Sequence, residues 1–203
     1  MPGPLEGIKV VEMGVWVAGP AAGGILADWG ADVIKVEAPP DGKEGLGGAR
    51  DGFDFQNLHR NKRSITLNLK TEEGVAIFKK MAKTADVIVE NYRPDVKFRL
   101  GVDYETIRAI NPAIVYASIS GFGQDGPIAK RPGFDQIAQG MGGLMSITGS
   151  PEDGPMRVGI PIADLCAGHF AAQGVLLALL GREQSGEGQW IQTSLLQAQV
   201  AML

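Results

Sequence analysis

The sequence has 203 residues, of which 44% are hydrophobic and 21% are charged, a composition typical of one sizeable globular domain. Its formal net charge of −4 argues against a general nucleic-acid-binding protein, which usually carries a basic excess. The single cysteine, Cys166, excludes an internal disulfide, and residues 1–6 lack the basic start and apolar run of a secretory signal, so we expect a reducing, cytoplasmic location.

The chain opens with a pattern of strand, helix and strand, at residues 8–13, 21–29 and 32–37. A β-α-β unit of this kind has a right-handed crossover. Glu37 ends the second strand with an acidic residue, as in dinucleotide-binding folds. The G-x-G-x-x-G fingerprint is absent, however, and residues 14–20 do not form a Walker loop. Nicotinamide binding is therefore the less favoured alternative.

A polar, glycine-rich stretch at residues 39–55 predicts a flexible surface loop. The densest basic cluster follows at residues 59–63, and two interpretations of it stay open: a solvated turn, or a patch for a phosphorylated ligand. Residues 64–70 alternate as a strand does. Thr71 then begins a helix with acidic residues in its first turn, where the helix dipole favours them.

A polar loop, Asn91-Tyr-Arg-Pro94, follows the predicted strand at residues 86–90. The carboxyl end of a parallel strand is where open α/β sheets bind ligands. Arg99 is either a candidate phosphate ligand or a cation that only stabilises a helix C-terminus. Downstream we expect a short helix capped by Asp103, a strand at residues 113–119 and a helical stretch at residues 135–145.

The next helix, at residues 165–180, is almost wholly apolar. A helix without a polar face is buried in a core or an interface, and this one is too short for a confident membrane span of about 20 residues. We interpret His169 as a hydrogen-bonded core histidine and Cys166 as a buried, inert thiol.

Asp164 stands at the mouth of this helix and has two interpretations. As an N-cap, its carboxylate accepts hydrogen bonds from the first free amides. As a nucleophile, it needs no base near neutral pH, because a free aspartate has a pKa of about 3.9 and the helix N-terminus favours the ionised form. Small neighbours, Ala163, Ala167 and Gly168, leave room for a substrate beside it.

The last predicted elements are a short strand at residues 189–193 and a helix that Ser194 starts. This helix is still apolar at Met202 and Leu203 and has no capping residue. We therefore expect the polypeptide to continue, or a partner polypeptide to complete it.

Three motifs occur in a fixed order, which is a more specific signal than any one short pattern. They are Gly-Ile-Pro-Ile-Ala-Asp-Leu-Cys-Ala-Gly at residues 159–168, Ala-Leu-Leu-Gly-Arg-Glu at residues 178–183 and Ser-Gly-Glu-Gly-Gln at residues 185–189. Together they resemble the class III CoA-transferases, a family that includes formyl-CoA transferase, the carnitine and bile-acid CoA-transferases and a branch of α-methylacyl-CoA racemases. The resemblance runs from Leu5 to the last residue.

The resemblance implies an α/β fold with a Rossmann-like, open, mainly parallel sheet and helices on both faces. Residues 1–203 would form the N-terminal portion of a CoA-binding large domain. A second, smaller domain would be absent from this chain, and the full-length protein would be an interlocked homodimer.

The resemblance also implies the chemistry and the site. CoA would pass from an acyl-CoA donor to a carboxylic acid through an Asp164 anhydride and an aspartyl-CoA thioester. CoA and acyl-CoA would be substrates, with no tightly bound cofactor and no metal. Where the family often places an arginine against the adenine, this sequence has Ala38. The residues that the resemblance assigns to CoA binding are Val17, Ala18, Leu67, Asn68, Leu69, Lys70, Asn91, Tyr92, Arg93, Arg99 and Arg131.

Two alternatives remain beside the transferase. The racemase branch needs an acid/base pair on opposite faces of its substrate and uses a histidine where this sequence has Phe134, which does not carry a proton. The chain could also bind CoA without turnover. We expect neither a nucleic acid nor a membrane as a partner.

Overall fold

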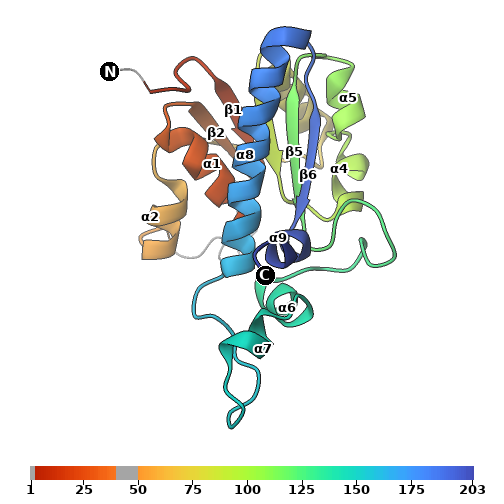
Figure 1. Ribbon diagram of the computed structural model, residues 1–203. Coiled ribbons are helices and arrows are strands. Elements are labelled where there is room, and N and C mark those ends of the chain that lie inside the picture. The colour runs from red at the N-terminus through yellow and green to blue at the C-terminus, as the bar shows by residue number, and fades with distance from the viewer. Residues whose placement is uncertain (1–2, 40–49) are drawn as a thin grey trace.

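The computed structural model describes residues 3–39 and 50–203. Within them, six parallel strands form one sheet in the order β3-β2-β1-β4-β5-β6 (Figure 1). This is the strand order of the doubly wound Rossmann fold, and it confirms the predicted fold class. The strands are β1 (Lys9–Glu12), β2 (Asp32–Glu37), β3 (Lys62–Thr66), β4 (Val87–Glu90), β5 (Val115–Ser120) and β6 (Trp190–Ser194).

Helices cover both faces of the sheet, and Figure 1 is viewed from the face that carries the first helix and the long eighth one. In the described part of the chain the helices are α1 (Ala18–Asp28), α2 (Phe53–His59), α3 (Glu72–Ala82), α4 (Pro94–Leu100), α5 (Tyr104–Arg108), α6 (Asp135–Met141), α7 (Leu144–Thr148), α8 (Ile162–Ser185) and α9 (Leu195–Ala201).

Each face of the sheet has its own hydrophobic core. Under α1 and α8, Leu26 and Val175 pack on Val10 and Val87. On the opposite face, α3 and α5 contribute buried side chains that pack with Ile88 and Tyr116. Because the central strands are covered on both sides, they appear in the sequence as continuous apolar runs rather than alternating ones.

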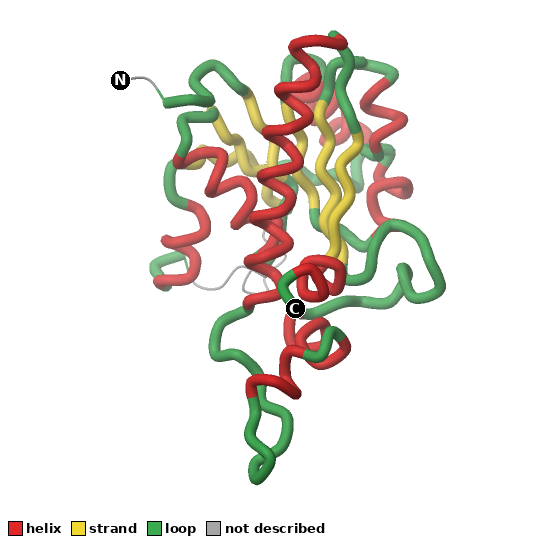
Figure 2. The backbone as a smooth tube through the Cα atoms, in the orientation of Figure 1, coloured by secondary structure: helices red, strands yellow, loops and turns green. Residues whose placement is uncertain are grey.

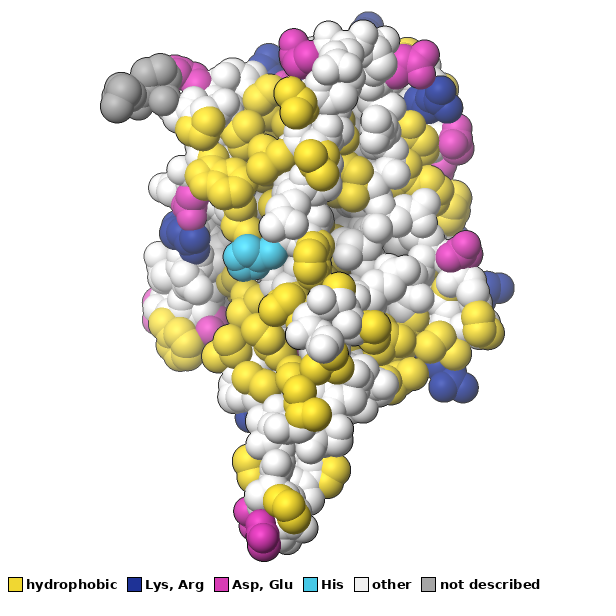
Figure 3. All heavy atoms as spheres, viewed as in Figure 1, with side chains coloured by type: hydrophobic (Ala, Val, Ile, Leu, Met, Phe, Trp, Pro, Cys, Tyr) yellow, Lys and Arg dark blue, Asp and Glu magenta, His cyan; other side chains and the backbone are white. Residues whose placement is uncertain are grey.

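Small residues let α8 lie close to α1. A side chain at Gly168 would come within 2.8 Å of the Ala18 carbonyl oxygen, so glycine is required at this crossing. The prediction of a buried helix holds for this face only, because Leu177 and Leu180 on the outer face are 70% and 64% exposed. Figure 3 shows the resulting apolar surface along α8 and over α6 and α7. By length and composition alone α8 could cross a membrane, but here it is a core helix of the sheet.

Several predicted boundaries were wrong. His59 ends α2, a helix that the sequence did not indicate, and β3 ends at Thr66 rather than at residue 70. The helical stretch expected at residues 135–145 divides into α6 and α7, because Gly143 adopts φ of 93° between them. Of the predicted loop at residues 39–55, residues 40–49 lie outside the described residues.

His169 is exposed on the outside of α8, so its assignment to the core was wrong. Its Nδ1 lies 2.8 Å from the Leu165 carbonyl oxygen, one helical turn earlier, which confirms the hydrogen bond but not the burial.

The arrangement places functional groups at one edge of the sheet. The order of the strands reverses between β1 and β4, and ligands of open α/β sheets bind outside the carboxyl ends of the strands at such a point. The first turn of α8 lies at this edge, beside α6 and α9. Figure 2 shows the loop between α7 and α8 extending away from the sheet below it.

Candidate active site

Asp164 is the third residue of α8 and is not its N-cap. The capping group is Asp135, at the start of α6, whose Oδ1 accepts hydrogen bonds from the backbone N–H of Ala163 at 2.8 Å and of Asp164 at 3.2 Å. The Oδ2 of Asp135 accepts from Gln139 at 2.6 Å. The predicted N-cap role of Asp164 was therefore wrong, and within the described residues its own carboxyl group has no hydrogen-bond donor.

The half-buried carboxyl group of Asp164 borders a cavity of about 610 Å³ at the point where the strand order reverses. The walls come from the loops that follow β1, β4 and β5 and from the first turn of α6. The lining includes Val15, Trp16, Val17, Asn91, Ser120, Gly121, Phe134, Asp135 and Asp164. This cavity supplies the open approach that a nucleophile needs.

Burial raises the pKa of Asp164 from 3.8 to about 7, and the charge of the neighbouring Asp135 adds to the shift. The sequence predicts instead that the helix N-terminus favours the ionised form of this group near neutral pH. A helix dipole contributes only about 0.3–1 kcal/mol at such a position, which burial beside a second carboxyl group outweighs. Near neutral pH, Asp164 is therefore divided between its protonated and ionised forms.

The turn at residues 14–17 forms one wall of the cavity and is held by Asn91. The Asn91 side chain accepts from Val15 N at 2.8 Å and donates to Val15 O at 2.7 Å, which joins the loop after β4 to the loop after β1. Trp16, between these loops, has φ of 60°, a left-handed conformation that residues other than glycine seldom adopt. Val17 lines the cavity, and Ala18 is buried as the first residue of α1.

A second cavity, of about 920 Å³, lies between β2, α3 and α4. It brings together six of the predicted CoA-binding residues: Leu67, Asn68, Leu69, Lys70, Tyr92 and Arg99. Ala38 lines it as well, so this wall carries a methyl group where the resemblance led us to look for a guanidinium. Lys79 on α3 is a further cation in the lining that sequence reasoning missed, although it lies two turns after Glu72 on the same helix.

The other two predicted arginines line neither cavity. Arg93 and Arg131 are both exposed, the first at the N-terminus of α4 and the second in the loop before α6. Eight of the eleven predicted residues therefore form two groups, Val17 and Asn91 beside Asp164 and six residues around the larger cavity, whereas Ala18, Arg93 and Arg131 line neither cavity.

The basic cluster at residues 59–63 is not a free phosphate patch. Arg60 is bound to Asp28, Lys62 to Glu12 and Arg63 to Asp32, so each cation is paired within the chain. Nor is the cluster only a solvated turn, because the side chain of Lys62 is 2% exposed.

Cys166 is half-buried, and burial raises the pKa of its thiol, in keeping with an inert group. In the described residues, no group of three or more His, Cys, Asp and Glu side chains is placed to hold a metal ion.

Comparison with known proteins gives consistent results. The model of "CoA-transferase family III" matches residues 5–203. Succinate–glutarate CoA-transferase of Agrobacterium fabrum is 44% identical over 98% of this chain and 53% of its own length. Acetyl-CoA:oxalate CoA-transferase of Acetobacter aceti is 43% identical over 99% and 53%, respectively. The chain thus spans about half the length of these curated relatives.

Among solved structures, a CAIB/BAIF family protein from Brucella suis superimposes with a TM-score of 0.93 at 39% identity. The alignment covers 100% of this chain and 56% of that protein.

Proposed function

The chain belongs to CoA-transferase family III, and on this premise we propose that the whole protein moves CoA from an acyl-CoA donor to a carboxylic acid. The observation that carries the proposal is Asp164: its helix is capped by another side chain, and Asp164 itself lines an open cavity. The relatives named above are CoA-transferases of succinate, glutarate and oxalate. We therefore propose a short dicarboxylic acid as the acceptor.

In the first proposed step, the ionised carboxylate of Asp164 attacks the carbonyl carbon of the acyl-CoA. The carbon–sulfur bond breaks, CoA leaves as a thiolate, and a mixed anhydride joins Asp164 to the acyl group. The thiolate then attacks the Asp164 carbonyl carbon of this anhydride. An aspartyl-CoA thioester forms, and the donor acid leaves as a carboxylate.

The acceptor acid reverses this sequence. Its carboxylate attacks the aspartyl-CoA thioester and releases CoA thiolate, which then attacks the acceptor side of the new anhydride. The products are the acceptor's CoA thioester and the free Asp164 carboxylate. No net proton is transferred, so a general base is not required.

Positioning must supply most of the rate, because a carboxylate is a weak nucleophile; well-oriented groups gain about 7–11 kcal/mol in this way. We propose that the cavity of about 920 Å³ holds the nucleotide end of CoA, with Lys70, Lys79 and Arg99 near its phosphates. The thioester end would then reach the cavity of about 610 Å³ that contains Asp164. Fixing the two ends separately would hold the carbonyl carbon near the nucleophile.

The racemase alternative gains no support from this site. Phe134 lines the Asp164 cavity and is 58% exposed, so a side chain that cannot carry a proton occupies the position where that branch has its histidine. Deuterium entering the α-carbon of a 2-methylacyl-CoA in deuterated water, at a rate comparable with CoA transfer, would favour the racemase.

We also propose a homodimer. The exposed apolar side chains of α8 and α9, among them Leu177, Leu180 and Val200, support a second copy as the group that covers them. Light scattering of the full-length protein tests this proposal, and a monomer at micromolar concentration would reject it.

The decisive experiment uses the full-length protein and a panel of short acyl-CoA donors and dicarboxylic acids. Asp164→Ala should abolish transfer, whereas Asp125→Ala, on an exposed loop, should not change it. Incubation with donor alone should place CoA on the peptide that contains Asp164, and hydroxylamine should remove it. Donor-dependent transfer that persists in Asp164→Ala would refute the mechanism.

A further inference from the structure

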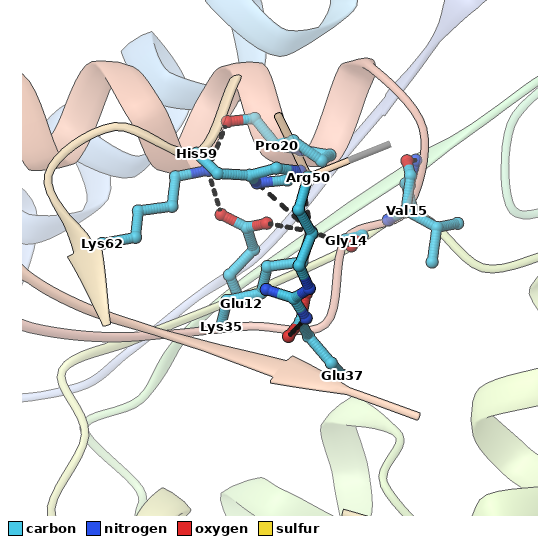
Figure 4. A network of polar contacts seen from close by, with 10 residues as sticks. Glu12, Gly14, Val15, Pro20, Lys35, Glu37, Arg50, His59 and Lys62 are labelled. Carbon is cyan, nitrogen blue, oxygen red and sulfur yellow. Dashed lines mark hydrogen bonds and ion pairs between the residues drawn. The ribbon is translucent and has the colours of Figure 1, made fainter. Parts of the chain in front are cut away.

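A largely buried ion cluster lies beneath α1, outside the site described above (Figure 4). Glu12, the last residue of β1, has an exposed fraction of zero. Its Oε2 accepts a hydrogen bond from Lys62 Nζ at 2.6 Å, and its Oε1 lies 3.7 Å from Lys35 Nζ. Two ammonium groups, from β2 and β3, therefore surround one carboxylate.

The sequence of α1 makes room for this cluster. A side chain at Gly23 would overlap the Glu12 carboxylate and would come within 3.3 Å of Lys62 Nζ. Only a glycine there allows the helix to lie over the ion pair. The small residues of α1 thus serve two contacts, one with α8 above and one with the charges below.

The two lysines hold the two ends of one segment, residues 14–20, which consists of the turn after β1 and the first three residues of α1. Lys35 Nζ lies 3.4 Å from the Gly14 carbonyl oxygen, and Lys62 Nζ donates to the Pro20 carbonyl oxygen at 2.7 Å. Asn91 holds the middle of the same turn through Val15. The turn includes Trp16 in its left-handed conformation, and it forms a wall of the Asp164 cavity.

The charges in the cluster have been desolvated. Burial lowers the pKa of Lys35 and of Lys62, and the charge of Glu12 opposes that shift. Burial also lowers the pKa of His59, whose ring nitrogens lie 3.3 Å from Lys35 Nζ, to about 3, so this imidazole is neutral near pH 7. A buried ion pair adds little net stability compared with an apolar core of the same volume. A geometric role better accounts for three charged groups at this place.

We propose that Lys62 and Lys35, with Glu12 between them, are positioning residues that fix the segment of residues 14–20, of which residues 15–17 form a wall of the Asp164 cavity. The expected effect on kcat/KM rests on the proposed function, whereas the expected effect on the backbone of residues 14–20 does not. None of the three side chains lines that cavity, so they act through the backbone carbonyl groups of Gly14 and Pro20.

The test compares two variants with one control in the full-length protein. Lys62→Met removes the donor to Pro20 and leaves Glu12 with Lys35 as its counter-charge. Glu12→Gln/Lys62→Met also removes the carboxylate charge, so that Lys35 is the one charged group left between the two positions. Arg63→Met is the control, because Arg63 lies next to Lys62 in the chain but forms an exposed ion pair with Asp32.

The first measurement is hydrogen exchange followed by mass spectrometry, without substrate. Both Lys62 variants should speed exchange of the amides of residues 15–19 and of Ala21 about tenfold, with α5 and β5 unchanged and with Arg63→Met like wild type. The second is steady-state kinetics well below the unfolding temperature, where kcat/KM for acyl-CoA should fall about ten- to hundredfold in both variants.

The outcomes separate the two proposals. Unchanged exchange of the amides of residues 15–19 and of Ala21 in the double variant would overturn the positioning role, whatever the kinetics show. A lower melting temperature with normal exchange and normal kcat/KM would show a purely structural ion pair and overturn it as well. If wild type has no transferase activity, the proposed function fails, while faster local exchange in the variants would still support the positioning of the turn.

Discussion

Two carboxyl groups at the same edge of the sheet, one buried and one half-buried, have neighbours of opposite charge. Glu12, at the end of β1, has an ammonium group at 2.6 Å and another at 3.7 Å. Asp164, in the first turn of α8, has a second carboxylate, Asp135, as its charged neighbour and opens to a cavity. Burial raises the pKa of both groups, but only for Glu12 do neighbouring charges oppose the shift.

The difference indicates what each group is for. A carboxylate matched by cations and enclosed by α1 stays in one place and can fix the backbone around it. A carboxyl group left beside a like charge is less stable in its ionised form. This repulsion is relieved only when the charge is transferred or neutralised, as in acylation. Removing these two side chains should therefore change the stability of the fold in opposite directions.

The largest expected effect is at Glu12. Glu12→Ala leaves Lys35 and Lys62 buried without a counter-charge and should lower the free energy of unfolding by about 3–5 kcal/mol. Urea denaturation at pH 7 measures this loss. The control is Asp32→Ala, which removes the partner of Arg63 from an ion pair whose two side chains are both exposed, and should cost less than about 1 kcal/mol. Equal losses in the two variants would mean that burial does not distinguish the pairs.

At Asp164 the expected change is smaller and has the opposite sign. The pKa of this group is about 7 in the folded protein and 3.8 without the fold, so the folded state retains a proton that the unfolded chain releases between about pH 4 and pH 7. The stabilisation that the Asp164 carboxyl group gives the wild-type fold is thus present at low pH and is lost as the pH rises to 7. An asparagine side chain in its place does not titrate, so it carries no such dependence.

Asp164→Asn should therefore raise the free energy of unfolding by about 2 kcal/mol at pH 8, after a discount for partial exposure, and by nothing at pH 4. Urea denaturation at the two pH values provides the measurement, with Asp125→Asn as the exposed control. A variant that is equally stabilised at both pH values would show that the gain has another cause than the ionisation of Asp164.

The sequence predicted the architecture well because apolar runs and turn residues are local signals. The strands at residues 32–37 and 86–90, and the caps at Thr71, Asp103 and Ser194, were recognised in this way and are confirmed. The α2 helix was missed because it has no buried residue, and therefore no apolar periodicity to detect.

The site was predicted less completely, because its electrostatics depend on contacts between distant residues. Asp135 accepts hydrogen bonds from Ala163 and Asp164, which lie 28 and 29 positions later in the chain, and no local pattern indicates this contact. For the same reason the basic cluster at residues 59–63 suggested a phosphate site: the carboxylates that pair with it come from β1, α1 and the start of β2. The resemblance supplied Asp164 itself, but not its pKa.

The smallest expected effect, and the one that separates the two causes of the raised pKa, is at Asp135. Asp135→Asn keeps an oxygen to accept from Ala163 N and Asp164 N, and removes the negative charge. Because burial is the larger cause and remains, the pKa of Asp164 should fall only by about one unit from its value of about 7.

Since the ionised form is the nucleophile in the proposed mechanism, the acid limb of kcat/KM should move to lower pH by the same amount. The pH–rate profile of the full-length enzyme measures this shift, and Asp135→Ala, which removes the cap too, should lower the melting temperature as well. An acid limb that stays near pH 7 in Asp135→Asn would mean that Asp164 does not sense this charge, and the contrast with Glu12 would then depend on burial alone.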